Sequence, residues 1–185
     1  MRIFSSFDTR YKKKLLSDKQ LQYGSDKVLL VEKSGLFLFV KVYFPIIISL
    51  LVGLVTGLSI DYFLETQTIR SVLTGSLMAL FMLIPYRIFK HYIDYHMDYC
   101  LITPTEIILA EQSGIFKRQI RTLDASKIKS ISVHKKHVLK SIFNNGVILF
   151  LSDGDDNNLG EINIDYIYNP EAHKEKINAI MNESI

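Results

Sequence analysis

Two long runs of apolar residues dominate the pattern along this chain. Val42–Ile60 and Ser71–Tyr86 contain no charged residue, and only the ten residues 61–70 separate them. A helix needs about 20 apolar residues to cross the hydrocarbon core of a bilayer. The first run has that length, and the second reaches it if Arg70 and Arg87 flank it and extend their charged ends toward water.

The connector 61–70 is too short and too polar to be a domain. The pattern therefore predicts a transmembrane hairpin over residues 36–90, with spans at about 38–60 and 69–89 and both chain ends on one side. The alternative is a pair of buried helices in a soluble bundle. We favour the hairpin, because neither run shows the polar stripe that a soluble helix presents to water.

Positive charge predicts the orientation of this hairpin. Nine Lys and Arg residues precede the first apolar run, and Arg87 and Lys90 follow the second, whereas the connector contains only Arg70. Lys and Arg near the ends of a span favour the cytoplasmic side. We therefore expect a two-pass protein of the cell (cytoplasmic) membrane with both termini cytoplasmic. The single Cys100 agrees, since it leaves no disulfide framework.

Small residues recur at every fourth position in each span, a spacing that lets two helix backbones approach closely in lipid. They are Ser49, Gly53 and Gly57 in the first span and Ser71, Gly75 and Ala79 in the second. We interpret them as the packing face of the hairpin, with dimerisation between chains and coincidence as alternatives. Neither apolar run contains a Lys, Arg, His, Asp or Glu residue, which argues against a proton relay or an intramembrane active site.

After the hairpin the pattern changes to short strands, which predicts a domain over residues 97–185; residues 1–35 are expected to form an N-terminal arm. The strands are expected at Tyr99–Thr103, Glu106–Glu111, Gln119–Leu123, Lys127–Lys135, Val147–Leu151 and Glu161–Ile167. In the last strand Ile162, Ile164 and Tyr166 are expected on one face. The alternation in Lys127–Lys135 slips once near Lys129-Ser130, which marks either a bulge or the true start of the strand.

The connections between these strands are also predicted. Apolar residues at helical spacing indicate a short helix over His137–Phe143, followed by a turn at Asn144-Asn145-Gly146. Ser152–Asn158 is expected to be a hairpin loop. Pro170 opens a C-terminal helix whose buried stripe consists of Ala172, Ile177 and Ile180. Antiparallel strands closed by one helix predict an α+β domain with a small, partly open barrel.

Three segments together resemble the bacterial pleckstrin-homology (PH-like) family of small membrane proteins, the YdbS-like group. Ser25–Val31 resembles the acidic-then-apolar strand that precedes the first span in that family. Leu101–Phe116 and Lys127–Phe150 resemble its strand–hairpin and strand–helix–turn–strand segments, although Asn144 stands where the family often has Gly. The resemblance implies a PH-like fold held at the inner face of a bacterial membrane, without catalytic activity.

The densest group of basic and imidazole side chains is the candidate binding site. It comprises His134, Lys135, Lys136, His137 and Lys140. Such groups bind a lipid phosphate or an acidic segment of a partner protein. The alternative is that they form the solvated edge of a strand and a short helix.

Other chemistry finds little support. No set of His, Cys and carboxylate residues has the spacing of a metal site, and we predict no metal, no cofactor and no catalytic residue. The formal net charge of +3 is modest, and aromatic and basic residues are not interleaved as in RNA-binding signatures, so nucleic acid is not an expected partner.

These observations predict a non-catalytic, membrane-anchored scaffold or accessory module. Its expected partners are the lipid bilayer and either a protein segment or an anionic lipid headgroup; a homo-oligomer is compatible with the pattern. The alternative function is an accessory subunit of a membrane transporter, or a small membrane enzyme that needs a partner.

Overall fold

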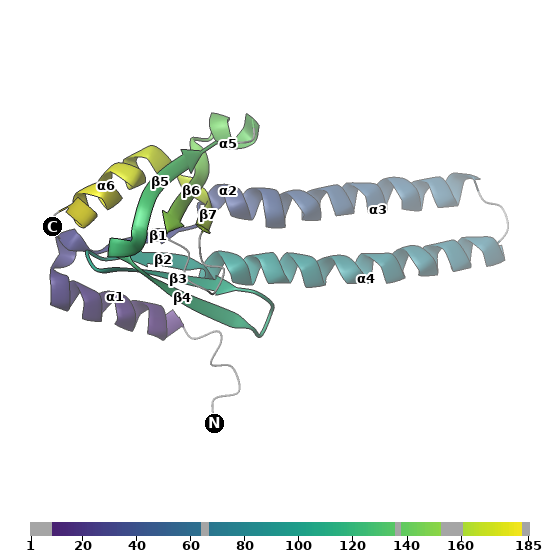
Figure 1. The fold of residues 1–185 in the computed structure, drawn as a ribbon. Coiled ribbons are helices and arrows are strands. Elements are labelled where there is room, and N and C mark those ends of the chain that lie inside the picture. The colour runs from purple at the N-terminus through teal and green to yellow at the C-terminus, as the bar shows by residue number, and fades with distance from the viewer. Residues whose placement is uncertain (1–8, 64–66, 136–137, 153–160, 183–185) are drawn as a thin grey trace, which may run out of the picture. The chain divides into compact units, whose positions relative to one another are not determined.

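A computed structural model describes residues 9–63, 67–135, 138–152 and 161–182 (Figure 1). The chain divides into two compact units, and only their described residues are discussed below. Unit 1 comprises Met1–Leu36 and Asp94–Ile185, and unit 2 comprises Phe37–Ile93. The chain combines helices with two antiparallel sheets, which confirms the α+β class; neither sheet closes into a barrel in the described part.

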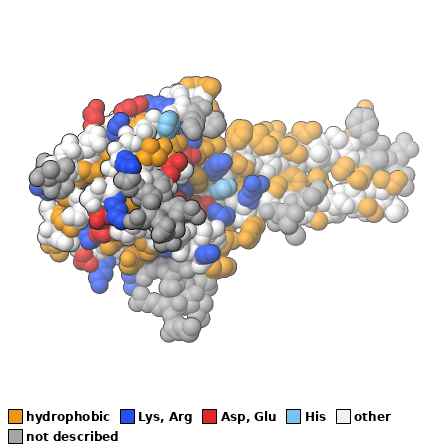
Figure 2. Space-filling model, in the orientation of Figure 1, with side chains coloured by type: hydrophobic (Ala, Val, Ile, Leu, Met, Phe, Trp, Pro, Cys, Tyr) orange, Lys and Arg blue, Asp and Glu red, His pale blue; other side chains and the backbone are white. Residues whose placement is uncertain are grey.

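Unit 2 is built from the two apolar runs. Its helices are α2 (Gly35–Leu38), a π-helical turn (Phe39–Tyr43), α3 (Phe44–Phe63) and α4 (Gln67–Met97). The first two residues of α2 and the last four of α4 belong to unit 1. Gly35–Ile60 and Gln67–Met97 are each long and apolar enough to cross a membrane. Core helices of a soluble protein would be mostly buried, whereas 6% and 0% of the most apolar windows of these two are buried. Hydrophobic side chains accordingly recur along both helices on the face that Figure 2 shows.

Unit 1 contains seven strands in two sheets. The four-stranded sheet has the order β1 (Leu29–Glu32), β2 (Tyr99–Ile102), β3 (Glu106–Gln112) and β4 (Arg118–Asp124). The three-stranded sheet has the order β5 (Ile128–His134), β6 (Asn145–Ser152) and β7 (Glu161–Tyr168). All pairs are antiparallel. Six strands lie where the apolar pattern predicts them, and β1 comes from the segment expected to be an arm.

Apolar side chains between the two sheets form the main core. Phe150 and Ile148 of β6 and Ile107 of β3 are fully buried in it. Helix α6 (Pro170–Asn182) covers this core with the predicted residues Ile177 and Ile180 buried, whereas Ala172 is only half-buried.

The N-terminal segment is integral to unit 1. Val31 of β1 lies in the main core, and β1 extends the sheet by pairing with β2. Helix α1 (Thr9–Tyr23) packs Leu15 and Leu16 onto the opposite face of that sheet. Because successive side chains of a strand point to opposite faces, β2 is buried on both sides, and all four of its residues are apolar.

Two bulges shift the register of the three-stranded sheet. The predicted slip at Lys129 is a register shift between Ile128 and Ser130. In β7, Asp165 and Tyr166 together lie opposite Val147, and Tyr166 has a φ of 60°. The expectation that Tyr166 shares a face with Ile162 and Ile164 is therefore wrong: the extra residue places Ile167 in the core instead.

The short helix α5 (Val138–Ile142) connects β5 to β6. Asn144 follows it with a φ of 49°, a conformation that Asn tolerates better than most residues other than Gly. The turn therefore forms at Asn144, one residue earlier than its predicted centre, and Gly146 already belongs to β6. A Cβ atom on Gly146 would lie 2.8 Å from Pro170 Cγ and 2.9 Å from the carbonyl oxygen of His134, which explains the glycine there. Of the predicted loop Ser152–Asn158, only Ser152 is among the described residues.

Candidate functional sites

Lys140 of the predicted basic cluster is buried inside unit 1. Its Nζ donates to Oδ1 of Asp165 and lies 4.3 Å from the centre of the Tyr166 ring. The same carboxylate oxygen accepts the backbone N–H of Tyr166 at 2.8 Å. Lys140 therefore fastens α5 to the bulge of β7.

Lys135 is also engaged within unit 1. Its Nζ donates to Oδ1 of Asn144 at 2.8 Å and pairs with Oε1 of Glu171 at 2.6 Å. The hydrogen bond from Lys135 holds the pKa of the Glu171 carboxyl below its usual value. His134 is exposed at the end of β5, and Lys136 and His137 lie outside the described residues. Both described lysines of the cluster thus have internal acidic partners, and its role in binding stays a prediction.

With Lys140 turned inward, α5 presents its apolar residues to the surface of unit 1. The exposed residues are Val138 (76%), Leu139 (52%), Ile142 (69%) and the following Phe143 (52%). Apolar surface of this kind is typical of contacts with protein or membrane.

One end of unit 1 carries both connections to the apolar helices. Glu32 at the end of β1 lies opposite Tyr99 at the start of β2, so the chain leaves and returns at neighbouring positions. Next to them, Lys33 Nζ lies 2.5 Å from Oδ2 of Asp98, whose Oδ1 accepts the backbone N–H of Gln112 at 2.7 Å. Burial raises the pKa of the Asp98 carboxyl, and the charge of Lys33 opposes that shift. We call this region the exit end.

Helix α5 lies close to the exit end. The backbone N–H of Ser34 donates to the carbonyl oxygen of Tyr166 at 2.7 Å. The hydroxyl of Ser34 donates to Oδ1 of Asn145, which begins β6 just after α5. The exposed apolar residues of α5 and both chain connections therefore share one side of unit 1.

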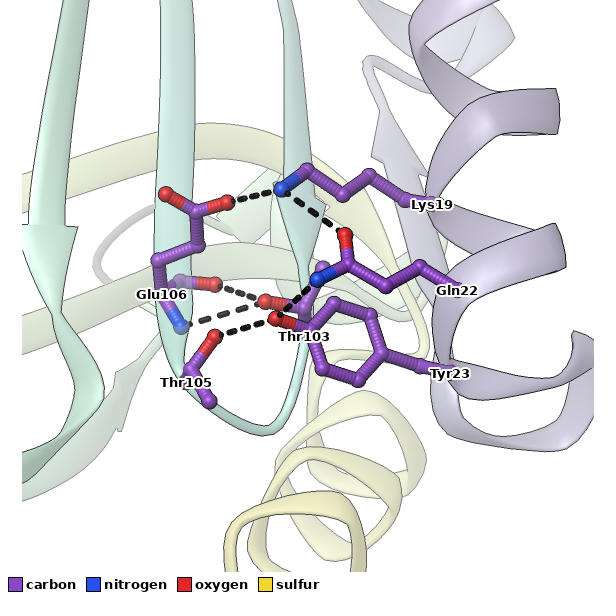
Figure 3. Close-up of polar contacts among 6 residues, drawn as sticks. All are labelled: Lys19, Gln22, Tyr23, Thr103, Thr105 and Glu106. Atoms are coloured by element: carbon purple, nitrogen blue, oxygen red, sulfur yellow. Dashed lines mark hydrogen bonds and ion pairs between the residues drawn. The ribbon is translucent and has the colours of Figure 1, made fainter.

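The opposite end of β2 is fixed by α1, as Figure 3 shows. Lys19 Nζ lies 2.5 Å from Oε1 of Glu106, and the hydroxyls of Tyr23 and Thr105 are 2.8 Å apart. Within the turn, the Thr103 hydroxyl donates to the carbonyl oxygen of Glu106 at 2.8 Å. These contacts hold the β2–β3 turn rigidly against α1.

A cleft of about 710 Å³ borders this β2–β3 turn. Its walls are the turn, the short helix after β4 (Ala125–Lys127), the first half of β5 and the last turn of α6. Ile128, Ile131 and Met181 supply apolar surface in it. Among the described strands, β5 pairs only with β6, so the cleft lies beside an open sheet edge.

A second pocket, of about 480 Å³, lies inside unit 2 between the start of the first apolar helix and the last part of α4. Three basic side chains line it, Lys41, Arg87 and His91, together with apolar residues that include Pro45 and Ile84. Within the described part of the chain, no carboxylate lies within ion-pair distance of Lys41 or Arg87. This pocket was not predicted from the sequence, although Arg87 and His91 are four residues apart and so share a helix face.

The predicted small-residue face is uneven in the structure. A Cβ atom on Gly53 would lie 2.9 Å from Cζ of Phe81 in α4, whereas one on Gly57 or Gly75 would have no neighbour within 4 Å. Ser49 and Ser71 donate their hydroxyls to carbonyl oxygens of their own helices, those of Pro45 and Gln67. Ala79 is exposed. Close approach between the two helices is therefore concentrated at Gly53.

The different surroundings of Gly53 and Gly57 allow a matched test of helix packing. Gly53→Val is expected to destabilise the helix pair by about 1–3 kcal/mol, the usual cost of overpacking. Gly57→Val makes the same chemical change with space around it, so its effect on the pairing should be close to zero. Titration of the detergent-purified chain with dodecyl sulfate, followed by near-ultraviolet circular dichroism, measures the two effects. Equal losses in both variants would show that Gly53 has no special packing role.

Among the described residues, no group of three or more His, Cys, Asp or Glu side chains could hold a metal ion. Cys100 is fully buried, and that burial raises the pKa of its thiol. Comparison of the chain with protein-family models, curated proteins and solved structures found no match.

Proposed function

We propose that the chain is a non-catalytic, membrane-anchored module that holds unit 1 at the cytoplasmic face of a bacterial membrane, where its cleft binds an extended segment of a partner protein. The observation that carries the proposal is the cleft itself, which combines an open strand edge with apolar side chains. In this reading unit 1 is a PH-like domain; two antiparallel sheets followed by one C-terminal helix support that assignment.

Edge strand β5 supplies the recognition chemistry. An edge strand presents backbone N–H and C=O groups to which an extended peptide adds as a further strand. Main-chain hydrogen bonds give such a complex its affinity, and side-chain pockets give it specificity. Ile128, Ile131 and Met181 form an apolar surface for alternate side chains of the peptide.

The location of the cleft within unit 1 suits a soluble partner. The cleft borders the β2–β3 turn, at the end of β2 opposite to the exit end. With the exit end and the apolar surface of α5 directed toward the bilayer, the cleft is directed toward water. The ion pairs of Lys135 and Lys140 make the basic cluster a weaker candidate site than the cleft.

An accessory subunit of a membrane transporter, or a small membrane enzyme that needs a partner, would use the same cleft. The kind of partner distinguishes these functions. Identification of a soluble partner protein would favour the scaffold function, and identification of an integral membrane partner would favour the accessory-subunit function.

Two adjacent α6 residues test the cleft. Asn178 and Ala179 are both exposed, but only Asn178 lines the cleft. Random peptides displayed on phage are selected on the full-length protein in lipid nanodiscs. Asn178→Arg is expected to abolish binding of the selected peptides by filling the cleft, whereas Ala179→Arg keeps it. Selection of no peptide above background, or equal binding by both variants, would contradict the proposal.

A further inference from the structure

The pocket of unit 2 combines positive charge with apolar walls at one end of the helical hairpin. Lys41 follows the first turns of the first helix, and Arg87 and His91 lie on the last part of α4. Pro45, Ile84 and Ile88 complete the lining on the side of the apolar runs, and no acidic residue contributes to it. This is the arrangement that an anionic amphiphile requires.

Lys41 and Arg87 differ from other cationic side chains of the chain in their lack of a carboxylate partner among the described residues. Lys19, Lys33, Lys135 and Lys140 each have a carboxylate partner within unit 1. Lys41 and Arg87 have none in the described part of the chain, although they line the same pocket. Two cations that face one pocket repel each other, and an anion between them removes that repulsion.

We infer that this pocket binds the phosphate of an anionic phospholipid between Lys41 and Arg87, with the lipid acyl chains along Pro45, Ile84 and Ile88. Arg and Lys both form charge-assisted hydrogen bonds with phosphate oxygens, and the Arg guanidinium does so with two parallel donors. His91 also lines the pocket. Basic pockets between membrane helices are a known mode of recognition of anionic headgroups.

The two cations of the pocket predict that binding depends on the net charge of the lipid headgroup. Phosphatidylglycerol has a net negative charge and satisfies both cations. Phosphatidylcholine has the same phosphate but adds a choline cation, which Lys41 and Arg87 repel. The inference rests on the membrane anchoring of the proposed function, and it adds a ligand to the anchor itself.

The test uses full-length protein in detergent micelles and native mass spectrometry. The probes are phosphatidylglycerol, phosphatidylcholine and inorganic phosphate. We expect preferential binding of phosphatidylglycerol to the wild type and a loss of at least about tenfold in affinity for Lys41→Gln/Arg87→Gln, since one charge-assisted hydrogen bond accounts for such a factor. The control Lys13→Gln/Lys14→Gln removes the same charge from exposed positions of α1 and should bind as the wild type does.

A second variant keeps all the charges. Ile84→Phe fills the pocket with an apolar side chain in an apolar helix and should also reduce phosphatidylglycerol binding. Equal binding of the two lipids by the wild type, or unchanged binding by both variants, would overturn the inference. Binding of inorganic phosphate without lipid would assign the pocket to a soluble anion and would overturn it as well.

Flotation separates this inference from the proposed function. Wild type and variants are reconstituted into phosphatidylcholine vesicles and floated at high salt and alkaline pH. Protein that floats without any preference for phosphatidylglycerol refutes the lipid site and leaves the membrane anchor intact. Protein that does not float refutes the anchor, and the lipid site with it.

Discussion

Replacing Lys33 with Met is expected to lower the free energy of unfolding of unit 1 by about 3 kcal/mol at neutral pH, because it leaves a largely buried carboxylate without its partner. Lys33 pairs with Asp98 at 2.5 Å, and their side chains are 16% and 12% exposed. The double variant Lys33→Met/Asp98→Asn should recover most of the loss. The amide that replaces the carboxylate has no charge but keeps an oxygen that accepts the backbone N–H of Gln112.

The pH dependence of the Lys33→Met variant follows from the raised pKa of Asp98. Burial raises this pKa in the folded state, and loss of the Lys33 charge raises it further. The folded state then binds a proton more tightly than the unfolded state, so the destabilisation is greatest above the raised pKa and diminishes as the pH falls toward the usual value of 3.8. Thermal unfolding of the detergent-purified chain at several pH values measures this. A variant as stable as the wild type at neutral pH, or one that acid does not rescue, would contradict the account of the ion pair.

Val31→Asp is expected to lower the free energy of unfolding of unit 1 by about 4–5 kcal/mol, close to the whole stability of a marginally stable domain, since it buries an unpaired charge. Val31 is 1% exposed in the main core, and it comes from the N-terminal segment. Leu21→Asp on α1 introduces the same charge at a position that is 87% exposed, and its effect should be small. Thermal unfolding of the detergent-purified chain distinguishes the two variants. Similar stability of both variants would show that β1 does not belong to the sheet.

The strands after the hairpin were predictable because their signals are local. Alternation of apolar and polar residues determined β5, and its slip at Lys129 located a bulge. β1 was harder to predict, since it has four residues and pairs with β2, which begins at Tyr99 far along the sequence. Only the family resemblance of Ser25–Val31 implied a strand there, and no local signal identified its partner. The extra residue in β7 was hidden for a similar reason, because only the pairing with β6 shows it.

The candidate sites were less predictable than the fold. Helical spacing grouped the apolar residues of α5 on one face but did not indicate which face is buried. Lys140 is buried because the bulge of β7 places Asp165 within reach of its amine, a contact that no spacing in the sequence shows. The basic pocket had a local signal, since Lys41 and Arg87 flank the apolar runs, but their convergence on one pocket depends on how the two helices pack.

The pairing of Glu32 with Tyr99 also determines the order in which the protein folds during synthesis. β1 leaves the ribosome first, but its only partner strand in the described structure begins after residues 33–98, a stretch that includes both apolar helices. At about 5–20 residues per second, β1 waits several seconds before β2 exists. Completion of the four-stranded sheet therefore follows translation of the entire hairpin, and a chain truncated within α4 cannot bury Val31 against β2.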